Sequence, residues 1–227
     1  MTVKPPLPQT IRLRPLSESD KSQAFLWRND PSIYKWCRQA EPISLDHHRE
    51  YWARVEKDPH TRMYGVVADD VLVGVCGLTS IDWINRRAEF SLYIGPEHQG
   101  KGLGKLALET LCRHGFDVLN LNLIWGEAFE GNPALDTFQK VGFIEEGRRR
   151  QFYYREGNYV DAILFSLTRY EFAGSNLLAG TDSSLHIQQG DEGLPQFSKG
   201  RITAQEINQN DRTLRQAERE ADAYSTR

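Results

Sequence analysis

The stretch of sequence that decides the fold is Gln99-Gly100-Lys101-Gly102-Leu103-Gly104. It lies between a β-rich run that ends at Ile94 and an amphipathic run, residues 102–119, whose leucines recur at helical spacing. Glycines let the backbone approach a ligand closely. The first turn of a helix adds unpaired N–H groups and the positive end of the helix dipole. The sequence therefore predicts an anion cradle suited to a pyrophosphate.

The spacing of this loop excludes two common nucleotide-binding motifs. It does not follow GxxxxGK[ST], so it is not a P-loop. It is not the GxGxxG of a βαβ unit either, because the strands before it are joined as hairpins. Lys101 and Lys105 add positive charge beside the predicted cradle. The alternative interpretation is a glycine-rich loop that only caps a helix.

The segments on either side of the loop alternate between strand and helix patterns. Ser17 and Ser44 are predicted N-caps, and Asp69-Asp70 is a two-residue hairpin signal. Strands are expected at residues 11–14, 63–68, 71–78, 88–94, 121–129, 143–146 and 162–167, with helices from residues 18, 45, 102 and 132. The order β-α-α-β-β-β-α-β-α-β-β predicts an α/β (α+β) domain with a central mixed sheet flanked by helices.

The composition changes after Phe172. Residues 174–202 are spotted with glycine among polar residues, which is typical of a linker. Thr203 and Glu206 then form a capping box that opens a weakly amphipathic helix. We therefore expect a domain at 1–173, a flexible linker at 174–202, and a C-terminal helix or tail at 203–227. The helix would dock on a second copy or another partner, and the alternative is a disordered tail.

Composition and charge exclude several classes of protein. The formal net charge of -3 gives no basic field for nucleic acid. Three cysteines without CxxC spacing favour free thiols over a disulfide framework or a metal site. No run approaches the ~20 apolar residues that span a bilayer, and the first residues lack the apolar core of a signal peptide. We expect a soluble cytoplasmic protein with no metal and no membrane partner.

Two blocks of sequence resemble a known family. The Q-x-x-G-x-G loop that follows Ile94-Gly95-Pro96-Glu97, and a second block from Asn132 to Phe143 reading N-x-x-A…K-x-G-F, closely resemble the GNAT N-acetyltransferases over residues 10–170. The resemblance implies the GNAT-type acyl-CoA N-acyltransferase fold, with acetyl-CoA as co-substrate in a splayed cleft between the fourth and fifth strands. The cofactor-binding residues that it implies are Tyr93, Ile94, Gln99, Gly100, Lys101, Gly102, Leu103, Gly104, Lys105, Asn132, Phe138 and Lys140.

The N-terminal part resembles one branch of that family. Residues 27–31, Trp-Arg-Asn-Asp-Pro, followed by His48, are similar to amino-sugar-nucleotide and ribosomal-protein N-acetyltransferases. The expected function is acetyl transfer to a primary amine, in the first form an amino sugar on a nucleotide. The alternatives are a protein N-terminus as acceptor, or a non-catalytic CoA-binding scaffold. Trp27, Arg28, Asn29 and Tyr34 are expected to line the acceptor side.

Acetyl transfer to an amine needs a base, and Glu89 is our candidate. It stands in an apolar, aromatic strand, where partial desolvation suits a carboxylate to take a proton near neutral pH. The alternative interpretation is a solvated residue paired with Arg86 or Arg87, and His48 is the alternative base. By the resemblance, many family members have a tyrosine where Phe138 stands, so the usual proton donor to the leaving thiolate is absent.

Overall fold

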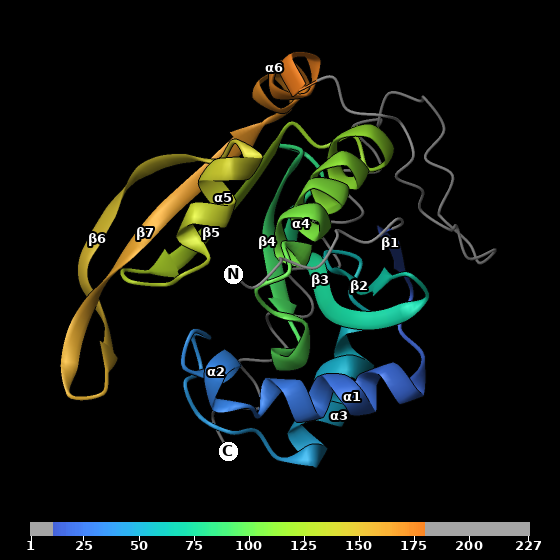
Figure 1. Ribbon diagram of the computed structural model, residues 1–227, viewed down its shortest axis with the longest axis vertical. Coiled ribbons are helices and arrows are strands. Elements are labelled where there is room, and N and C mark those ends of the chain that lie inside the picture. Colours follow the sequence, from blue (N-terminus) through green and yellow to red (C-terminus); the bar gives the residue numbers. More distant parts are fainter. Residues whose placement is uncertain (1–10, 180–227) are drawn as a thin grey trace, which may run out of the picture. The chain divides into compact units, whose positions relative to one another are not determined.

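A computed structural model of the protein describes residues 11–179 (Figure 1). Its elements in chain order are β1 Ile11–Arg14, α1 Glu18–Arg28, α2 Pro31–Tyr34, α3 Leu45–Val55, β2 Arg62–Ala68, β3 Val71–Asp82, β4 Arg87–Ile94, a short 3-10 helix Pro96–His98, α4 Leu103–Arg113, a π-helical turn His114–Val118, β5 Leu123–Phe129, α5 Leu135–Val141, β6 Ile144–Arg155, β7 Asn158–Thr168 and α6 Arg169–Ala179.

The seven strands form one mixed sheet in the order β1-β2-β3-β4-β5-β7-β6. All neighbours are antiparallel except β4 and β5, which run parallel. A parallel pair needs a crossover, and α4 supplies it. The central mixed sheet with flanking helices confirms the predicted fold class.

Helices cover the two faces of the sheet, and each face has its own core. On one face, α4 and α5 pack on the larger core, which includes Phe90, Ile94 and Leu108. On the other face, α1 contributes Ala24 and α3 contributes Trp52 to a smaller core around Val75 of β3. β4 therefore lies between two packed layers, which fixes the side chains of its alternate residues on opposite faces.

The cap and turn signals of the sequence are confirmed locally. Ser17 caps α1, and Asp20 completes the capping box by accepting a hydrogen bond from the Ser17 backbone at 2.7 Å. Ser44 caps α3. Asp69 and Asp70 both adopt positive φ, 45° and 67°, as a two-residue hairpin turn requires.

The structure differs from the sequence prediction at three places. α2 was not predicted because it is only four residues long. β6 and β7 are longer than predicted. The extra length of β6 has no signal in the sequence, because most of this strand is exposed and shows no alternation of apolar and polar residues. α6 continues past the predicted boundary at 173 to Ala179. The rest of the predicted linker and the predicted C-terminal helix or tail at 203–227 lie outside the described residues.

Two further properties bear on the predictions from composition. Cys37, Cys76 and Cys112 are free thiols, and the last two are buried. Within residues 11–179, no helix is both long enough and apolar enough to cross a membrane.

Candidate active site

The glycine-rich loop leads directly into α4. Gly100 and Gly102 adopt φ of 74° and 78°, the left-handed region that favours glycine, and Gly102 is the N-cap of the helix. No side chain caps the first amides of α4. Leu103, the first residue of α4, has its side chain buried in the larger core. The loop has the geometry expected of an anion cradle.

The two lysines of the loop are already placed by contacts within the chain. The Lys101 ammonium donates to the Glu97 carbonyl at 2.9 Å, and Lys105 pairs with Glu109 at 2.6 Å. Both bonds are at or near the surface, where such pairs contribute little to stability. Either side chain can therefore exchange its partner for a bound anion. Gln99 instead holds the loop, because its amide donates to the Ile94 carbonyl at 3.0 Å.

Trp27 of α1 supports the turn that precedes the loop. Its indole N–H donates to the Glu97 carboxylate at 3.0 Å, and its ring lies against Gly95. A Cβ at Gly95 would lie 2.4 Å from the indole ring, so no other residue fits there without displacing the ring. Trp27, predicted to line the acceptor side, is buried and fixes the entry to the loop.

β4 and β5 diverge beside this loop. Their parallel pairing covers only Arg87 to Glu89 against Leu123 to Trp125, although both strands continue to Ile94 and Phe129. We call this divergence the β4–β5 fork (Figure 1). Beyond it, the backbone of each strand lacks a strand partner on the side that faces the other. The fork matches the splayed strands that the family resemblance implies.

Aromatic rings fill the fork on its α4 and α5 face. The Phe90 ring packs against Gly126 of β5 so closely that a Cβ there would lie 2.4 Å from it. The same ring meets Phe138 and Phe143 at centroid distances of 5.0 and 4.9 Å. Phe138 is therefore a buried core residue of α5. Nearby, Asn132 accepts from the Ala134 amide at 2.9 Å, and Lys140 is exposed and paired with Asp136.

On the opposite face of the fork, two carboxylates share one arginine. Arg38, from the segment between α2 and α3, binds both oxygens of Glu89 and donates from Nε to Glu127 at 2.9 Å. Glu127 also accepts from the Tyr153 hydroxyl and, at 3.0 Å, from Arg149. Glu89 is buried, and its partner is Arg38 rather than the neighbouring Arg86 or Arg87 that the sequence suggested. We call Glu89, Glu127 and Arg38 the acid–arginine bridge.

Glu127 and Arg38 of the bridge are stabilised in their charged forms. Burial favours the neutral form of Glu127, but hydrogen bonds from Tyr153 and Arg38 outweigh it and lower the pKa of this carboxyl. Burial likewise opposes the charge of Arg38, yet the two carboxylates raise the pKa of its guanidinium above its ordinary value. Glu127 and Arg38 are therefore both charged over the physiological pH range.

The other residues predicted to line the acceptor side have different surroundings. Asn29 caps the end of α1, and its side chain bonds both backbone groups of Ile43, at 2.7 and 3.0 Å. Arg28 donates to the Gln39 carbonyl at 2.8 Å, while its other terminal nitrogen is buried without a hydrogen bond. Tyr34 is half-buried on α2. Tyr93 packs toward α1 and α3, and burial strongly raises the pKa of its hydroxyl, whereas Ile94 points into the larger core.

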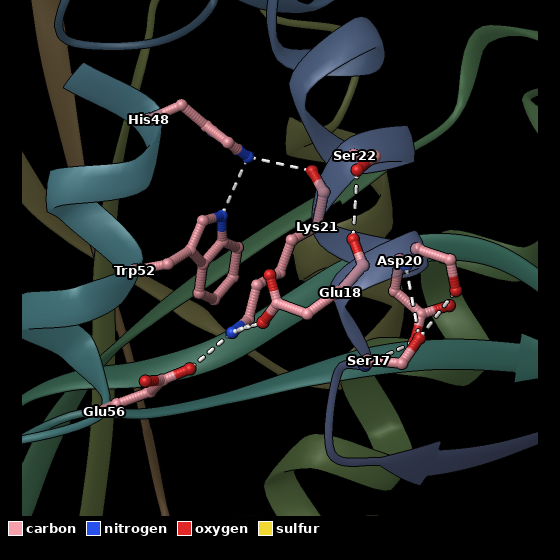
Figure 2. Close-up of polar contacts among 9 residues, drawn as sticks. Ser17, Glu18, Asp20, Lys21, Ser22, His48, Trp52 and Glu56 are labelled. Carbon is pink, nitrogen blue, oxygen red and sulfur yellow. Dashed lines mark hydrogen bonds and ion pairs between the residues drawn. The ribbon is translucent and has the colours of Figure 1, made fainter. Parts of the chain in front are cut away.

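His48 lies between two helices rather than at the fork. Figure 2 shows its ring reaching from α3 toward α1, where Nε2 lies 2.8 Å from the Lys21 carbonyl and 2.9 Å from the Trp52 indole nitrogen. Burial lowers the pKa of His48, so the imidazole is neutral at physiological pH. These contacts support a structural role for His48, as a histidine packed between α1 and α3, rather than a role as the base.

This interpretation predicts the behaviour of a His48→Ala variant. The free energy of unfolding should fall by roughly 1–3 kcal/mol, because a buried polar partner is lost and a cavity forms. The turnover number should stay within about twofold of the wild type. Urea unfolding and steady-state kinetics check the two expectations, and a large loss of turnover in a stably folded variant would instead favour His48 as the base.

Comparison with known proteins agrees with this geometry. Residues 10–144 match the family model described as acetyltransferase (GNAT) domain. A Bacillus subtilis protein named "Putative ribosomal N-acetyltransferase YdaF" is 32% identical over 171 residues, which is 73% of this chain and 93% of that protein. The chain belongs to the GNAT acetyltransferase family. Like its relatives, this GNAT protein is an enzyme, an acetyl-CoA-dependent N-acetyltransferase.

Other relatives of this GNAT enzyme have small amines in their names. A Vibrio cholerae spermidine N(1)-acetyltransferase is 30% identical over 153 residues, 66% of this chain and 88% of that protein. The crystal structure of a Vibrio cholerae spermidine N-acetyltransferase with CoA and spermine superposes with a TM-score of 0.69. The two sequences are 27% identical, and the match covers 72% of this chain and 98% of the Vibrio cholerae chain.

Sequence reasoning missed part of this site. It did not single out Arg38, Glu127 or Tyr153. Arg38 binds both Glu89 and Glu127, and Tyr153 donates to Glu127. The alternation within β5 places Glu127 on the same face as Trp125, and a charged residue in that strand was a usable signal. Arg38 carried no such signal, because it stands in an irregular segment.

Proposed function

We propose that this GNAT enzyme acetylates a primary amine of a small cationic molecule, of the di- or polyamine class. The observation that supports the proposal is the pair of carboxylates, Glu89 and Glu127, on one face of the β4–β5 fork. Their side chains are 11% and 4% exposed. Buried carboxylates need cationic partners, and the ammonium of an acceptor would take the place that Arg38 holds between them. The relatives named for spermidine agree with this proposal.

The chemistry follows from the arrangement at the fork. The acceptor nitrogen, once neutral, attacks the thioester carbonyl, and Glu89 takes the proton that the nitrogen then releases. Unpaired backbone amides at the end of β4 stabilise the oxyanion, as the family resemblance implies. The tetrahedral intermediate then collapses to the amide and the CoA thiolate. With phenylalanine at position 138, the thiolate leaves unprotonated, which its acidity, near the ~8.5 of a cysteine thiol, permits.

Cofactor binding is assigned to the loop and to the fork. The amides of Gly102, Leu103 and Gly104 would hold the pyrophosphate, with Lys101 and Lys105 beside it. The backbone of Tyr93 and Ile94 would lie along the thioester arm. Asn132, just before α5, and the backbone of α5 at Phe138 would border it, while the Phe138 ring stays in the core. Among the residues predicted to bind the cofactor, Lys140 is the least supported, because it lies on the exposed side of α5 and pairs with Asp136.

A second candidate acceptor is an amino sugar on a nucleotide. Arg28 favours it, because one of its terminal nitrogens is buried without a partner and could bind a phosphate. The arginine run that follows Gly147 supports an amino-sugar nucleotide less than Arg28 does. Arg148 pairs with Glu130 and Glu145, and Arg149 pairs with Glu127, so these charges are already balanced. A protein N-terminus is a third acceptor, suggested by the name of one relative.

The test is an acceptor screen with acetyl-CoA, read by mass spectrometry. The panel contains spermidine and putrescine, an amino-sugar nucleotide, and short peptides with free N-termini. The proposal expects a mass gain of one acetyl group on the polyamines at a rate well above the other acceptors. Preferential acetylation of the nucleotide or the peptides would contradict it, and no transfer to any amine would favour the scaffold alternative.

A further inference from the structure

Arg38 reaches the fork from solvent, whereas its two partners are buried. Its side chain is 53% exposed, and those of Glu89 and Glu127 are 11% and 4% exposed. The segment that bears it, between α2 and α3, has no regular secondary structure. A cation on a half-exposed side chain therefore balances two acids whose side chains are buried.

The two acids depend on Arg38 to different degrees. Glu127 keeps Arg149 and the Tyr153 hydroxyl if the Arg38 guanidinium leaves. Among residues 11–179, Glu89 has no other cationic partner than Arg38. A buried carboxylate left without a partner is strongly disfavoured. The bridge therefore opens only when another cation takes the place of the guanidinium.

The backbone around Arg38 is held in place, so the side chain is the part that can move. Arg155 donates to the carbonyls of Arg38 and Cys37 at 2.6 and 3.3 Å. Arg28 binds the next carbonyl, that of Gln39, and Asn29 binds Ile43. The segment is fixed from both sides, and the guanidinium can swing away by changing side-chain rotamers alone.

We infer that Arg38 is a specificity-determining residue that occupies, in the enzyme without acceptor, the place of the acceptor's second ammonium. This inference rests on the proposed function. A monoamine that reaches Glu89 needs to displace only the terminal nitrogens of Arg38, because Nε can stay on Glu127. A diamine displaces the guanidinium from both acids. Arg38 thus competes more strongly with diamines than with monoamines and sets the preference between them.

The test compares putrescine with its monoamine counterpart, butylamine, on the full-length enzyme. In Arg38→Gln, we expect the KM and the Kd for putrescine to fall about tenfold, the size of one charged hydrogen-bond contact. The values for butylamine should fall less, so the preference for the diamine rises. Arg38→Lys keeps a cation and should stay close to the wild type. If Arg38 instead binds the acceptor or positions Glu89, Arg38→Gln will raise KM for both amines or lower kcat, which overturns the inference.

Arg149→Gln is the matched control. It removes an arginine of similar exposure, 48%, that pairs with Glu127 and leaves the Glu89 contact intact. Its diamine preference should change much less than that of Arg38→Gln, because Arg38 and the Tyr153 hydroxyl still occupy Glu127. If the wild type acetylates no diamine, the proposed function fails on its own. Calorimetric titration with putrescine then decides the inference, and equal Kd values for wild type and Arg38→Gln overturn it.

Discussion

Replacing Glu89 by glutamine is expected to lower kcat by about 10²- to 10⁴-fold, the usual effect of losing a general base. Glutamine has nearly the same shape and can still accept a hydrogen bond from Arg38, but it cannot take a proton from the acceptor nitrogen. Glu89 lies at the last position where β4 pairs with β5, which is where the fork begins. The loss should therefore appear in turnover far more than in the KM for the acceptor or the Kd for CoA.

Glu127→Gln separates this effect from a general disturbance of the bridge. Glu127 shares Arg38 and the same face of the fork, but it stands on β5 and retains its hydrogen bond from Tyr153. We expect it to raise the acceptor KM with a much smaller change in kcat. Steady-state kinetics across pH compare the two variants. Near wild-type turnover of Glu89→Gln at every pH would show that another base, or none, operates.

The parts of the site that the sequence predicted are the local ones. Glycines before a helical repeat specify the loop from within a few residues, because a left-handed N-cap and a free helix start need no distant contact. The cap of α1 and the turn at Asp69 are predictable for the same reason. The fold class followed from the order of such local signals.

The parts that the sequence could not predict depend on long-range packing. Glu89 was given a neighbouring arginine as its alternative partner, and the structure pairs it with Arg38, which is 51 positions away in the chain. Phe138 was placed at the cofactor by resemblance, yet its ring lies among other aromatic side chains of the core. Neither the bridge nor this aromatic cluster has a periodic pattern, since each combines single residues from several elements.

The second large effect is expected from Gly102→Glu, which should weaken CoA binding by about 10²- to 10³-fold. A carboxylate at the N-cap of α4 would lie beside a bound pyrophosphate. Like charges about 4 Å apart repel by roughly 4 kcal/mol near a protein surface. Glutamate would also occupy the space through which the backbone approaches the ligand. Calorimetry with CoA measures the loss directly, without any need to know the acceptor.

Two controls separate the repulsion from strain. Gly102 has φ of 78°, so any side chain there adds backbone strain of roughly 1–3 kcal/mol. Gly157, with φ of 85° and open space around it in the β6–β7 turn, lets Gly157→Glu impose similar strain and the same charge far from the loop. That variant should bind CoA like the wild type. Gly102→Gln has the strain and the bulk without the charge and should fall between the two. Unchanged CoA affinity in a folded Gly102→Glu protein would show that the pyrophosphate does not bind at this loop, since a negative charge at the helix start must weaken the binding of an anion there.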